Sequence, residues 1–321
     1  MPRVMCLSGY SLPLADIARE MKPSGWDLTF VDPAAPEIER EKAAAEADFI
    51  LVFGHGLSGN VLRAAKRCRL VQLASAGYDG VDLKLAGEMG IPVANNGGAN
   101  AIPVAEFAMT LMLGAARHLI ESDRSTRAGG WMPKALDGYD TWELFGKTVG
   151  IVGAGRIGST VARLLRGFET ITLYSDVKKS PDAEKYGAKR VPLDTLLRES
   201  DVVTVHVPLL KSTTKLIGAR ELELMKPSAL LVNTCRGPVV DEKALLAALT
   251  AKRIWGAGLD VFELEPAQAD NPLFKLDNVV VAPHLAGKSH ESYPRRVGFA
   301  YKNMAQVWAG GPPESVVLPE E

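Results

Sequence analysis

Three ionisable side chains, Arg236, Glu265 and His284, each follow a short apolar run that predicts a buried strand. In open parallel sheets, ligands bind outside the carboxyl ends of the strands, so this position marks the three as candidates. A guanidinium can hold a carboxylate and polarise a ketone, and an imidazole can deliver a proton to a developing alkoxide. A carboxylate beside the imidazole keeps it protonated and aimed. Hydride reduction of a 2-keto acid requires these three kinds of group. The alternative is that each is an ordinary surface residue, which is the more common case for any one of them taken alone.

A glycine-rich turn lies earlier in the chain, where Gly153-x-Gly155-x-x-Gly158 joins an apolar run to a helical pattern. The first glycine permits a tight turn, the second lets the backbone approach a pyrophosphate, and the third lets helix and strand pack closely. The N–H groups at the helix N-terminus then face the anion. Strand, turn and helix occur in the required order, which predicts a dinucleotide site rather than an ordinary turn.

An acidic residue, Asp176, follows the next apolar run, eighteen positions after Gly158. An aspartate there can accept hydrogen bonds from both hydroxyls of the adenosine ribose and repels a 2′-phosphate. We therefore expect NAD (NADH) and regard NADP as the less favoured cofactor, a preference that the nearby Lys178 and Lys179 temper.

A small-residue turn, Ser75, Ala76 and Gly77, follows the apolar run LVQL. Consecutive backbone N–H groups in such a turn can form a concave anion site for a substrate carboxylate. A tight turn without a ligand is the alternative. His55, which follows another apolar run, either faces the substrate or is an exposed loop residue.

Apolar runs alternate with amphipathic stretches in two series, a pattern typical of parallel sheets with helical crossovers. Between the series, Ala101–Ile120 is expected to form one helix that Asn100 caps, with His118 as a solvated residue near its end. The first series predicts strands at Val4–Leu7, Leu28–Val31, Phe49–Phe53, Leu70–Leu73 and Pro92–Ala94. The second predicts strands at Thr148–Val152, Thr170–Tyr174, Val202–Val205, Ala229–Asn233, Gly256–Leu259 and Val279–Val281, then a helix to about Trp308.

The composition suits a soluble globular protein of two domains. The 321 residues are 47% hydrophobic and 23% charged, with a net charge of -1, so nothing favours nucleic-acid or anionic-membrane binding. No apolar stretch is long enough for a membrane span. The three cysteines have no metal-ligand spacing and no disulfide framework, which favours a reducing cytoplasm and predicts no metal site.

The motifs together resemble the D-isomer-specific 2-hydroxyacid dehydrogenase family, from ASAGYDGVDL through the glycine loop to PHLAG and the last helix. The resemblance implies that Arg236 binds the substrate carboxylate and keto oxygen, that His284 is the general acid–base, and that Glu265 pairs with His284. It implies an α/β fold of two doubly wound parallel-sheet domains. A Rossmann NAD-binding domain, residues 100–286, would be inserted into a flavodoxin-like substrate domain, residues 1–99 and 287–321.

The family further implies where the ligands make contact. Ser75, Ala76 and Gly77 are expected to bind the substrate together with Arg236 and His284. The expected cofactor contacts are Gly153, Gly155, Arg156, Ile157, Gly158, Asp176, His206, Pro208, Thr213, Thr234, Cys235, Asp260 and Gly287. The resemblance also implies a homodimer built around the helix at 101–120.

Two questions stay open at the level of sequence. The segment GKSHESYPRR, with Arg295 and Arg296, either adds positive charge near a charged substrate or is a solvated helix face, and the solvated face is favoured. The second question is the class of protein. The alternative to an enzyme is an NAD(H)-binding corepressor of the C-terminal binding protein type, which shares the fold and the three residues but acts by binding partner proteins.

Overall fold

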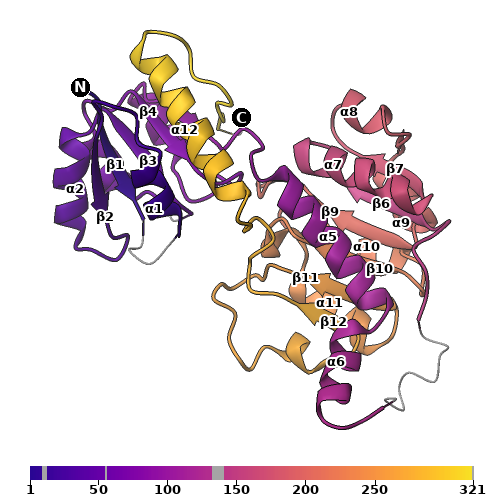
Figure 1. The fold of residues 1–321 in the computed structure, drawn as a ribbon. Coiled ribbons are helices and arrows are strands. Elements are labelled where there is room, and N and C mark those ends of the chain that lie inside the picture. The colour runs from indigo at the N-terminus through magenta and orange to yellow at the C-terminus, as the bar shows by residue number, and fades with distance from the viewer. Residues whose placement is uncertain (9–12, 55, 132–140, 320–321) are drawn as a thin grey trace. The chain divides into compact units, whose positions relative to one another are not determined.

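The computed structural model describes residues 1–8, 13–54, 56–131 and 141–319. The chain divides into two compact units. Unit 1 comprises Met1–Asn100 and Lys288–Glu321, and unit 2 comprises Ala101–Gly287 (Figure 1). Each unit has its own parallel sheet and its own hydrophobic core.

Unit 1 contains a five-stranded parallel sheet in the order β2-β1-β3-β4-β5, which is the flavodoxin-like order. Its strands are β1 (Arg3–Leu7), β2 (Asp27–Val31), β3 (Phe49–Val52), β4 (Leu70–Leu73) and β5 (Val93–Ala94). Its helices are α1 (Pro13–Glu20), α2 (Glu37–Glu46), α3 (Gly59–Ala64), α4 (Leu83–Glu88) and α12 (Ser292–Trp308).

Helices cover both faces of this sheet, so its central strands β3 and β4 are buried along their whole length and apolar except for Gln72. In β3 and β4 all residues are buried, as expected for a parallel sheet between two helical layers. Successive side chains join different clusters. Ile50 and Val52 pack with the residues of one cluster, whereas Phe49 and Leu51 pack with Val297 and Met304 of α12.

Unit 2 contains a seven-stranded parallel sheet in the order β12-β11-β10-β9-β6-β7-β8. Counted from β6, this is the Rossmann order 3-2-1-4-5-6 with one strand added beyond the sixth. The strands are β6 (Thr148–Val152), β7 (Ile171–Ser175), β8 (Lys189–Arg190), β9 (Val202–Val205), β10 (Leu230–Asn233), β11 (Gly256–Leu259) and β12 (Val279–Val281).

Seven α-helices and three 3₁₀ turns are described in unit 2. The α-helices are α5 (Ala101–Ala116), α6 (Leu119–Arg127), α7 (Arg156–Leu165), α8 (Pro181–Glu184), α9 (Leu193–Glu199), α10 (Ala219–Leu224) and α11 (Glu242–Thr250). The 3₁₀ turns are η2 (Arg166–Phe168), η3 (Gly237–Val239) and η4 (Pro272–Lys275). Among the described residues, no helix is both long and apolar enough to cross a membrane.

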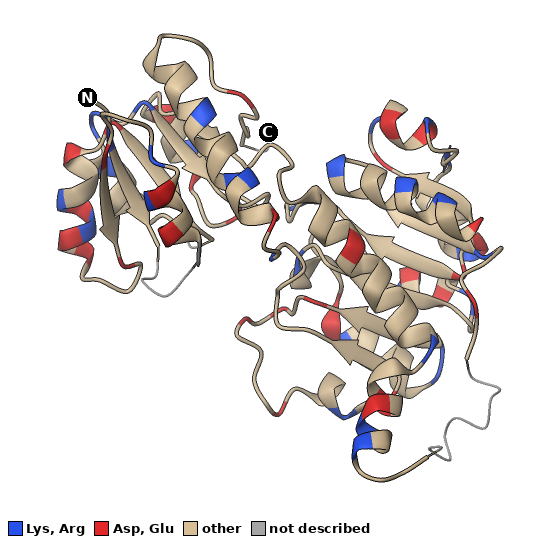
Figure 2. Ribbon diagram, viewed as in Figure 1, with Lys and Arg blue, Asp and Glu red and all other residues tan. Residues whose placement is uncertain are grey.

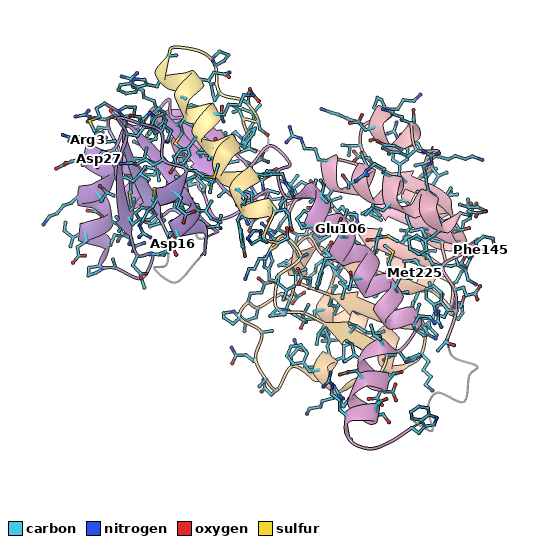
Figure 3. All side chains as sticks on the ribbon, viewed as in Figure 1. Arg3, Asp16, Asp27, Glu106, Phe145 and Met225 are labelled. Carbon is cyan, nitrogen blue, oxygen red and sulfur yellow. The ribbon has the colours of Figure 1, made fainter. Side chains whose placement is uncertain are left out.

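Side chains fill the space between the helices and the sheet in each unit (Figure 3). Met225 in unit 2 is 1% exposed, whereas Phe145 is 62% exposed. On the surface, acidic and basic residues are interspersed, as along α2 in unit 1 (Figure 2). The predicted fold class, two doubly wound parallel-sheet domains, is confirmed.

The expectation of a single helix over residues 101–120 is wrong. The chain turns at His118, whose φ of 46° is left-handed, and this turn separates α5 from α6. His118 is also not solvated: its side chain is 14% exposed and its ring packs edge-on against Trp255, with the centroids 5.4 Å apart. Asn100 does not cap α5, because its side-chain oxygen is buried without a hydrogen-bond partner.

Candidate active site

Three neighbouring strands of unit 2 carry the three predicted reactive side chains. β10 pairs with β11 and β11 pairs with β12, all in parallel, so their carboxyl ends lie along the same edge of the sheet. Arg236 follows β10, Glu265 follows β11 and His284 follows β12. The topology therefore brings together residues that are up to 48 positions apart in sequence.

The imidazole of His284 is bonded to the carboxylate of Glu265. Nδ1 of His284 lies 2.6 Å from Oε2 of Glu265, and the other oxygen, Oε1, accepts a hydrogen bond from the Phe262 N–H at 3.0 Å. The His284 side chain is 45% exposed within this chain. Its second ring nitrogen, Nε2, makes no hydrogen bond to a described residue, so it is available to a reacting group.

Glu265 is ionised at neutral pH in this arrangement. Burial raises the pKa of its carboxyl group, but the hydrogen bonds from His284 and Phe262 lower it more, and the charges of His284 and Arg236 add to that effect. The pKa of Glu265 therefore lies below its usual value of 4.5. An ionised Glu265 accepts a hydrogen bond from Nδ1–H, which fixes both the tautomer and the orientation of the ring.

Asp260 holds the loop that carries His284. Its side chain is buried, with Oδ1 accepting from the Leu285 N–H at 2.8 Å and Oδ2 accepting from the Ala286 N–H at 2.9 Å. Its carbonyl accepts from the His284 N–H at 2.7 Å. Burial raises the pKa of Asp260, and the two N–H bonds oppose that rise. Both carboxylate oxygens thus position the loop, a function that the sequence did not indicate.

The Arg236 loop is packed against the loop that carries Glu265. A Cβ at Gly237 would come within 1.9 Å of the carbonyl of Phe262, so only glycine permits this approach. Asn233 secures the loop from below: Oδ1 accepts from the Cys235 N–H, and Nδ2 donates to the Arg236 carbonyl, each at 3.0 Å. Arg236 is therefore held close enough for its charge to act on Glu265.

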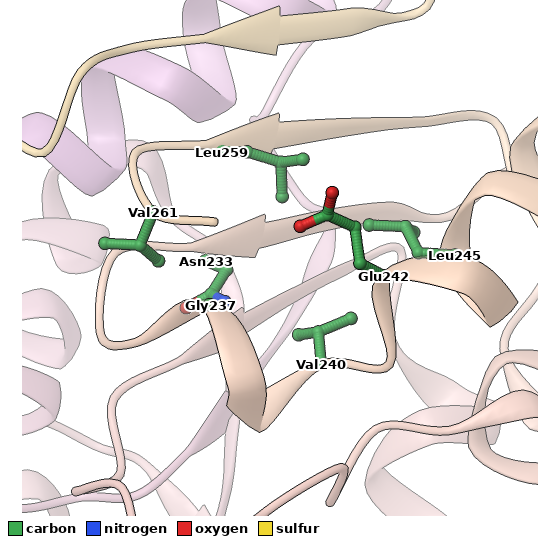
Figure 4. A pocket seen from close by; sticks show the side chains of 7 residues that line it. All are labelled: Asn233, Gly237, Val240, Glu242, Leu245, Leu259 and Val261. Carbon is green, nitrogen blue, oxygen red and sulfur yellow. The ribbon is translucent and has the colours of Figure 1, made fainter. Parts of the chain in front are cut away.

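A small pocket lies beneath the Arg236 loop (Figure 4). It is lined by Asn233, Gly237, Val240, Glu242, Leu245, Leu259 and Val261. Glu242 bonds from there to the N–H of Glu263 at 2.9 Å and to Asn271 at 2.7 Å. The lining does not include the three reactive side chains. The residues around this pocket therefore support the Arg236 loop and do not form the reaction site.

The glycine-rich turn follows β6, and each of its glycines has a different constraint. Gly153 has a φ of +91°, and a Cβ there would meet the His206 carbonyl at 2.8 Å. A Cβ on Gly158 would lie 2.1 Å from the Gly153 oxygen. Gly155 has no neighbour within 4 Å of its Cβ position and an ordinary φ of −71°, so the protein itself does not require glycine there. A phosphate group of a ligand that approaches the backbone at this position would require glycine. The glycine-rich turn therefore fits a dinucleotide.

Asp176 lies beside this turn. Its Oδ2 accepts from the Ala154 N–H at 2.8 Å, and its Oδ1 accepts from the Lys178 N–H at 3.1 Å. Arg190 of the edge strand β8 donates to the carbonyls of Asp176 at 2.8 Å and Val177 at 3.1 Å. No sequence pattern indicates Arg190, because β8 is only two residues long and exposed.

His206 follows β9, which pairs with β6 at the point where the strand order reverses. Its Nε2 lies 2.9 Å from the Thr204 hydroxyl and its Nδ1 lies 3.5 Å from the Thr234 hydroxyl. Burial lowers the pKa of His206 to about 3, so the ring is neutral at physiological pH. Thr204, which sequence reasoning missed, is a buried strand residue and carries no recognisable motif.

The other expected cofactor contacts also lie in unit 2. Arg156 and Ile157 form the first turn of α7. Thr213 donates to the Pro208 carbonyl at 2.6 Å and closes the loop after β9. The Cys235 thiol has its pKa raised to about 11 by burial, and it donates to Asn233 at 3.1 Å. Gly287 is the last residue of the unit.

The expected substrate loop, Ser75–Gly77, follows β4 in unit 1. Its carbonyl oxygens are bound from within the unit: those of Ser75 and Ala76 accept from Asn96 N–H and Asn95 Nδ2, and that of Gly77 accepts from the Ser75 hydroxyl. The N–H groups of the loop donate to no described residue. A loop whose carbonyl oxygens are occupied and whose N–H groups have no acceptor suits a bound anion. His55 lies outside the described residues.

Residues 109–286 match the family model described as D-isomer specific 2-hydroxyacid dehydrogenase, NAD binding domain. A protein named glyoxylate reductase from Korarchaeum cryptofilum (strain OPF8) is 45% identical over 269 residues, covering 82% of this chain and 80% of that protein. The solved structure of a glyoxylate reductase from Paecilomyes thermophila has a TM-score of 0.87 and 28% identity, covering 98% of each chain. An acyclic imino acid reductase, Bsp5, in complex with NADPH and D-Arg, has a TM-score of 0.85 and 26% identity, covering 98% of this chain and all of that one.

Proposed function

Since this chain belongs to the D-isomer specific 2-hydroxyacid dehydrogenase family and is an oxidoreductase acting on 2-hydroxy acids, we propose that it reduces a small 2-keto acid with NADH. The observation that carries the proposal is the 2.6 Å bond between His284 and Glu265, which leaves Nε2 of His284 available. Arg236 is held in the adjacent loop. We assign His284 as the general acid–base, Glu265 as its partner and Arg236 as the ligand of the substrate carboxylate and keto oxygen.

Each of these side chains has a separate task in reduction. A nicotinamide cofactor, held by the glycine-rich turn, would supply a hydride for C2 of the substrate. Arg236 stabilises the negative charge that develops on the C2 oxygen. Nε2 of His284 then gives its proton to that oxygen, which completes the alcohol, and Glu265 stabilises the imidazolium beforehand. In the oxidation direction, neutral His284 accepts the hydroxyl proton.

We propose NAD as the cofactor in preference to NADP. Asp176 supports this assignment, because its carboxylate lies beside the glycine turn and repels a 2′-phosphate. Gly155 supports dinucleotide binding in general, since its Cβ position faces open space. Bsp5, which has the same fold, was solved in complex with NADPH, so the activity test compares both cofactors.

The proposed substrate class is glyoxylate, hydroxypyruvate or a close analogue. The name of the Korarchaeum relative, glyoxylate reductase, supports a small substrate. We further propose a homodimer in the cytoplasm. Leu119 and Ile120 at the start of α6 are 58% and 52% exposed, which suits an apolar interface. The cysteines Cys6, Cys68 and Cys235 are all free, which suits a reducing compartment.

Oxidation of NADH and of NADPH with a panel of 2-keto acids tests the proposal. We expect turnover with at least one short 2-keto acid and a higher kcat/KM with NADH than with NADPH. Tight NADH binding without turnover of any substrate would instead favour the corepressor class. Light scattering on the eluted protein tests the homodimer.

A further inference from the structure

Arg296 in α12 is a buried cation without an acidic partner among the described residues. The residue is only 8% exposed. Its Nε donates to the carbonyl of Ala74, and its guanidinium lies 5.9 Å from the ring centroid of Tyr293. The sequence favoured a solvated helix face for this segment. That expectation is wrong for Arg296, although it holds for Arg295, which is exposed.

The carbonyl that Arg296 binds belongs to the residue directly before the substrate loop. Ala74 ends β4, and Ser75, Ala76 and Gly77 follow it. The carbonyls of the loop are occupied from within the unit, whereas its N–H groups donate to no described residue. Arg296 is therefore bound to the residue that directly precedes the three N–H groups of Ser75–Gly77, which have no acceptor among the described residues.

A cation in this position is costly for the protein itself. Removing a charged group from water destabilises the fold unless an opposite charge offsets the loss. Burial lowers the pKa of Arg296, which reflects this loss of solvation. The two terminal nitrogens of Arg296 are not among the buried side-chain atoms without a hydrogen-bond partner, and no described residue accepts a hydrogen bond from them. An anion that reaches the loop would meet both the amide donors and this positive charge.

We propose that Arg296 is a specificity-determining residue that, together with the N–H groups of Ser75–Gly77, binds the carboxylate of the substrate within unit 1. The inference rests on the proposed function for the identity of that ligand, a small carboxylate. The charge, rather than the bond to Ala74, is the feature that acts. The Ala74 carbonyl also accepts from Asn96 Nδ2 at 3.5 Å, so the β4 end has a second attachment.

Two substitutions separate the charge from the hydrogen bond. Arg296→Gln keeps an N–H donor for Ala74 and removes the charge, whereas Arg296→Lys keeps the charge in a different geometry. Arg295→Gln is the matched control, because Arg295 is an exposed neighbour in the same helix and donates to the Ala99 carbonyl at 3.3 Å. Each variant is first compared with the wild type by circular dichroism and Tm.

The readout is oxalate binding to the full-length protein by calorimetry without cofactor, together with KM and kcat for glyoxylate. We expect Arg296→Gln to raise the Kd for oxalate and the KM for glyoxylate by about tenfold or more, the size of a lost charge-assisted bond. Arg296→Lys should retain most of the affinity, kcat should change little, and Arg295→Gln should match the wild type.

Two results would overturn the inference. One is an Arg296→Gln protein that keeps wild-type oxalate affinity, and the other is a wild-type protein that does not bind oxalate. If the Gln variant fails to fold, Arg296→Lys decides instead: a folded Lys variant that has lost oxalate binding contradicts a role for charge. The proposed function fails separately, because Arg296-dependent oxalate binding can persist in a protein that reduces no 2-keto acid.

Discussion

Asp260 and His284 are tied to each other by main chain and side chain together. The Asp260 carbonyl accepts from the His284 N–H at 2.7 Å, and the Asp260 carboxylate accepts from the next two N–H groups, at 2.8 and 2.9 Å. His284 has a φ of 50°, a conformation that non-glycine residues rarely adopt. The buried carboxylate therefore fixes a backbone turn that the proposed proton donor requires.

Replacement of Asp260 by asparagine should disturb this turn. An amide offers one acceptor in place of two, so a buried N–H of Leu285 or Ala286 loses its partner. We expect a loss of about 1–3 kcal/mol in the free energy of unfolding, measured in urea, and a lower kcat. Asp270→Asn changes an exposed carboxylate without a described partner and should leave both unchanged. Wild-type stability in Asp260→Asn would contradict the assigned role.

Glu265→Gln tests the partner of the general acid–base. Glutamine keeps the size of the side chain but cannot stabilise an imidazolium by charge. We expect kcat for keto-acid reduction to fall by about tenfold or more above neutral pH, with NADH affinity retained. Stopped-flow measurement of NADH oxidation across pH gives the comparison. A pH profile identical to the wild type would remove Glu265 from the mechanism.

The same pair predicts how stability depends on pH. The pKa of Glu265 is lowered in the folded state, so its contribution is present above its usual value of 4.5 and is lost as the pH falls through the lower folded value. The difference in Tm between the wild type and Glu265→Gln should thus be constant from neutral pH to about pH 5 and shrink in more acidic buffer. A difference that grows on acidification has the wrong sign for this interpretation.

Gly155 and Gly167 form a matched pair near the two ends of α7. Neither has a neighbour within 4 Å of its Cβ position, and neither has a positive φ, so alanine is sterically acceptable at both. Only Gly155 belongs to the glycine-rich turn. We expect Gly155→Ala to weaken NADH binding, followed by fluorescence titration, by about tenfold or more, and Gly167→Ala to leave it unchanged. Equal effects would show that the turn does not contact the cofactor.

Asp176→Ala should reduce the preference for NAD over NADP. The substitution removes the acceptor for the ribose hydroxyls and the charge that opposes a 2′-phosphate, while Lys178, Lys179 and Arg190 remain nearby. We expect the ratio of kcat/KM for NADH to that for NADPH to fall by at least about tenfold. An unaltered ratio would assign cofactor selection to other residues.

Much of the fold could be predicted because strands buried on both faces are continuous apolar runs. Thr148–Val152 and Val202–Val205 have the observed bounds for this reason. The break at His118 could not be predicted, because the apolar stretch continues through it, while a tertiary contact with Trp255 and a local contact with Glu121 support the turn. Pro103 lies in the first turn of α5, where proline is tolerated, and Gly114 lies inside α5, so neither residue marks the position of the break.

Part of the candidate site could also be predicted from the sequence. Glycines, acids and the histidine at strand ends have a recognisable spacing, since the sheet brings strand ends together. The parts played by Arg190 and Thr204 and the burial of Arg296 could not be predicted, because an arginine or threonine in a strand or helix has the same sequence pattern whether it is solvated or buried. Only the neighbours in space decide between the two.

Unit 1 is formed by two segments, one from each end of the chain, and this affects the order in which its core can form during synthesis on the ribosome. Val297, Ala300 and Met304 of α12 fill the same cluster as Phe49 and Leu51 of β3, yet they are synthesised about 250 residues later. Unit 2 is continuous and can complete its core while α12 is still in the exit tunnel. The first hundred residues therefore leave the apolar face of their sheet uncovered until α12 has been synthesised.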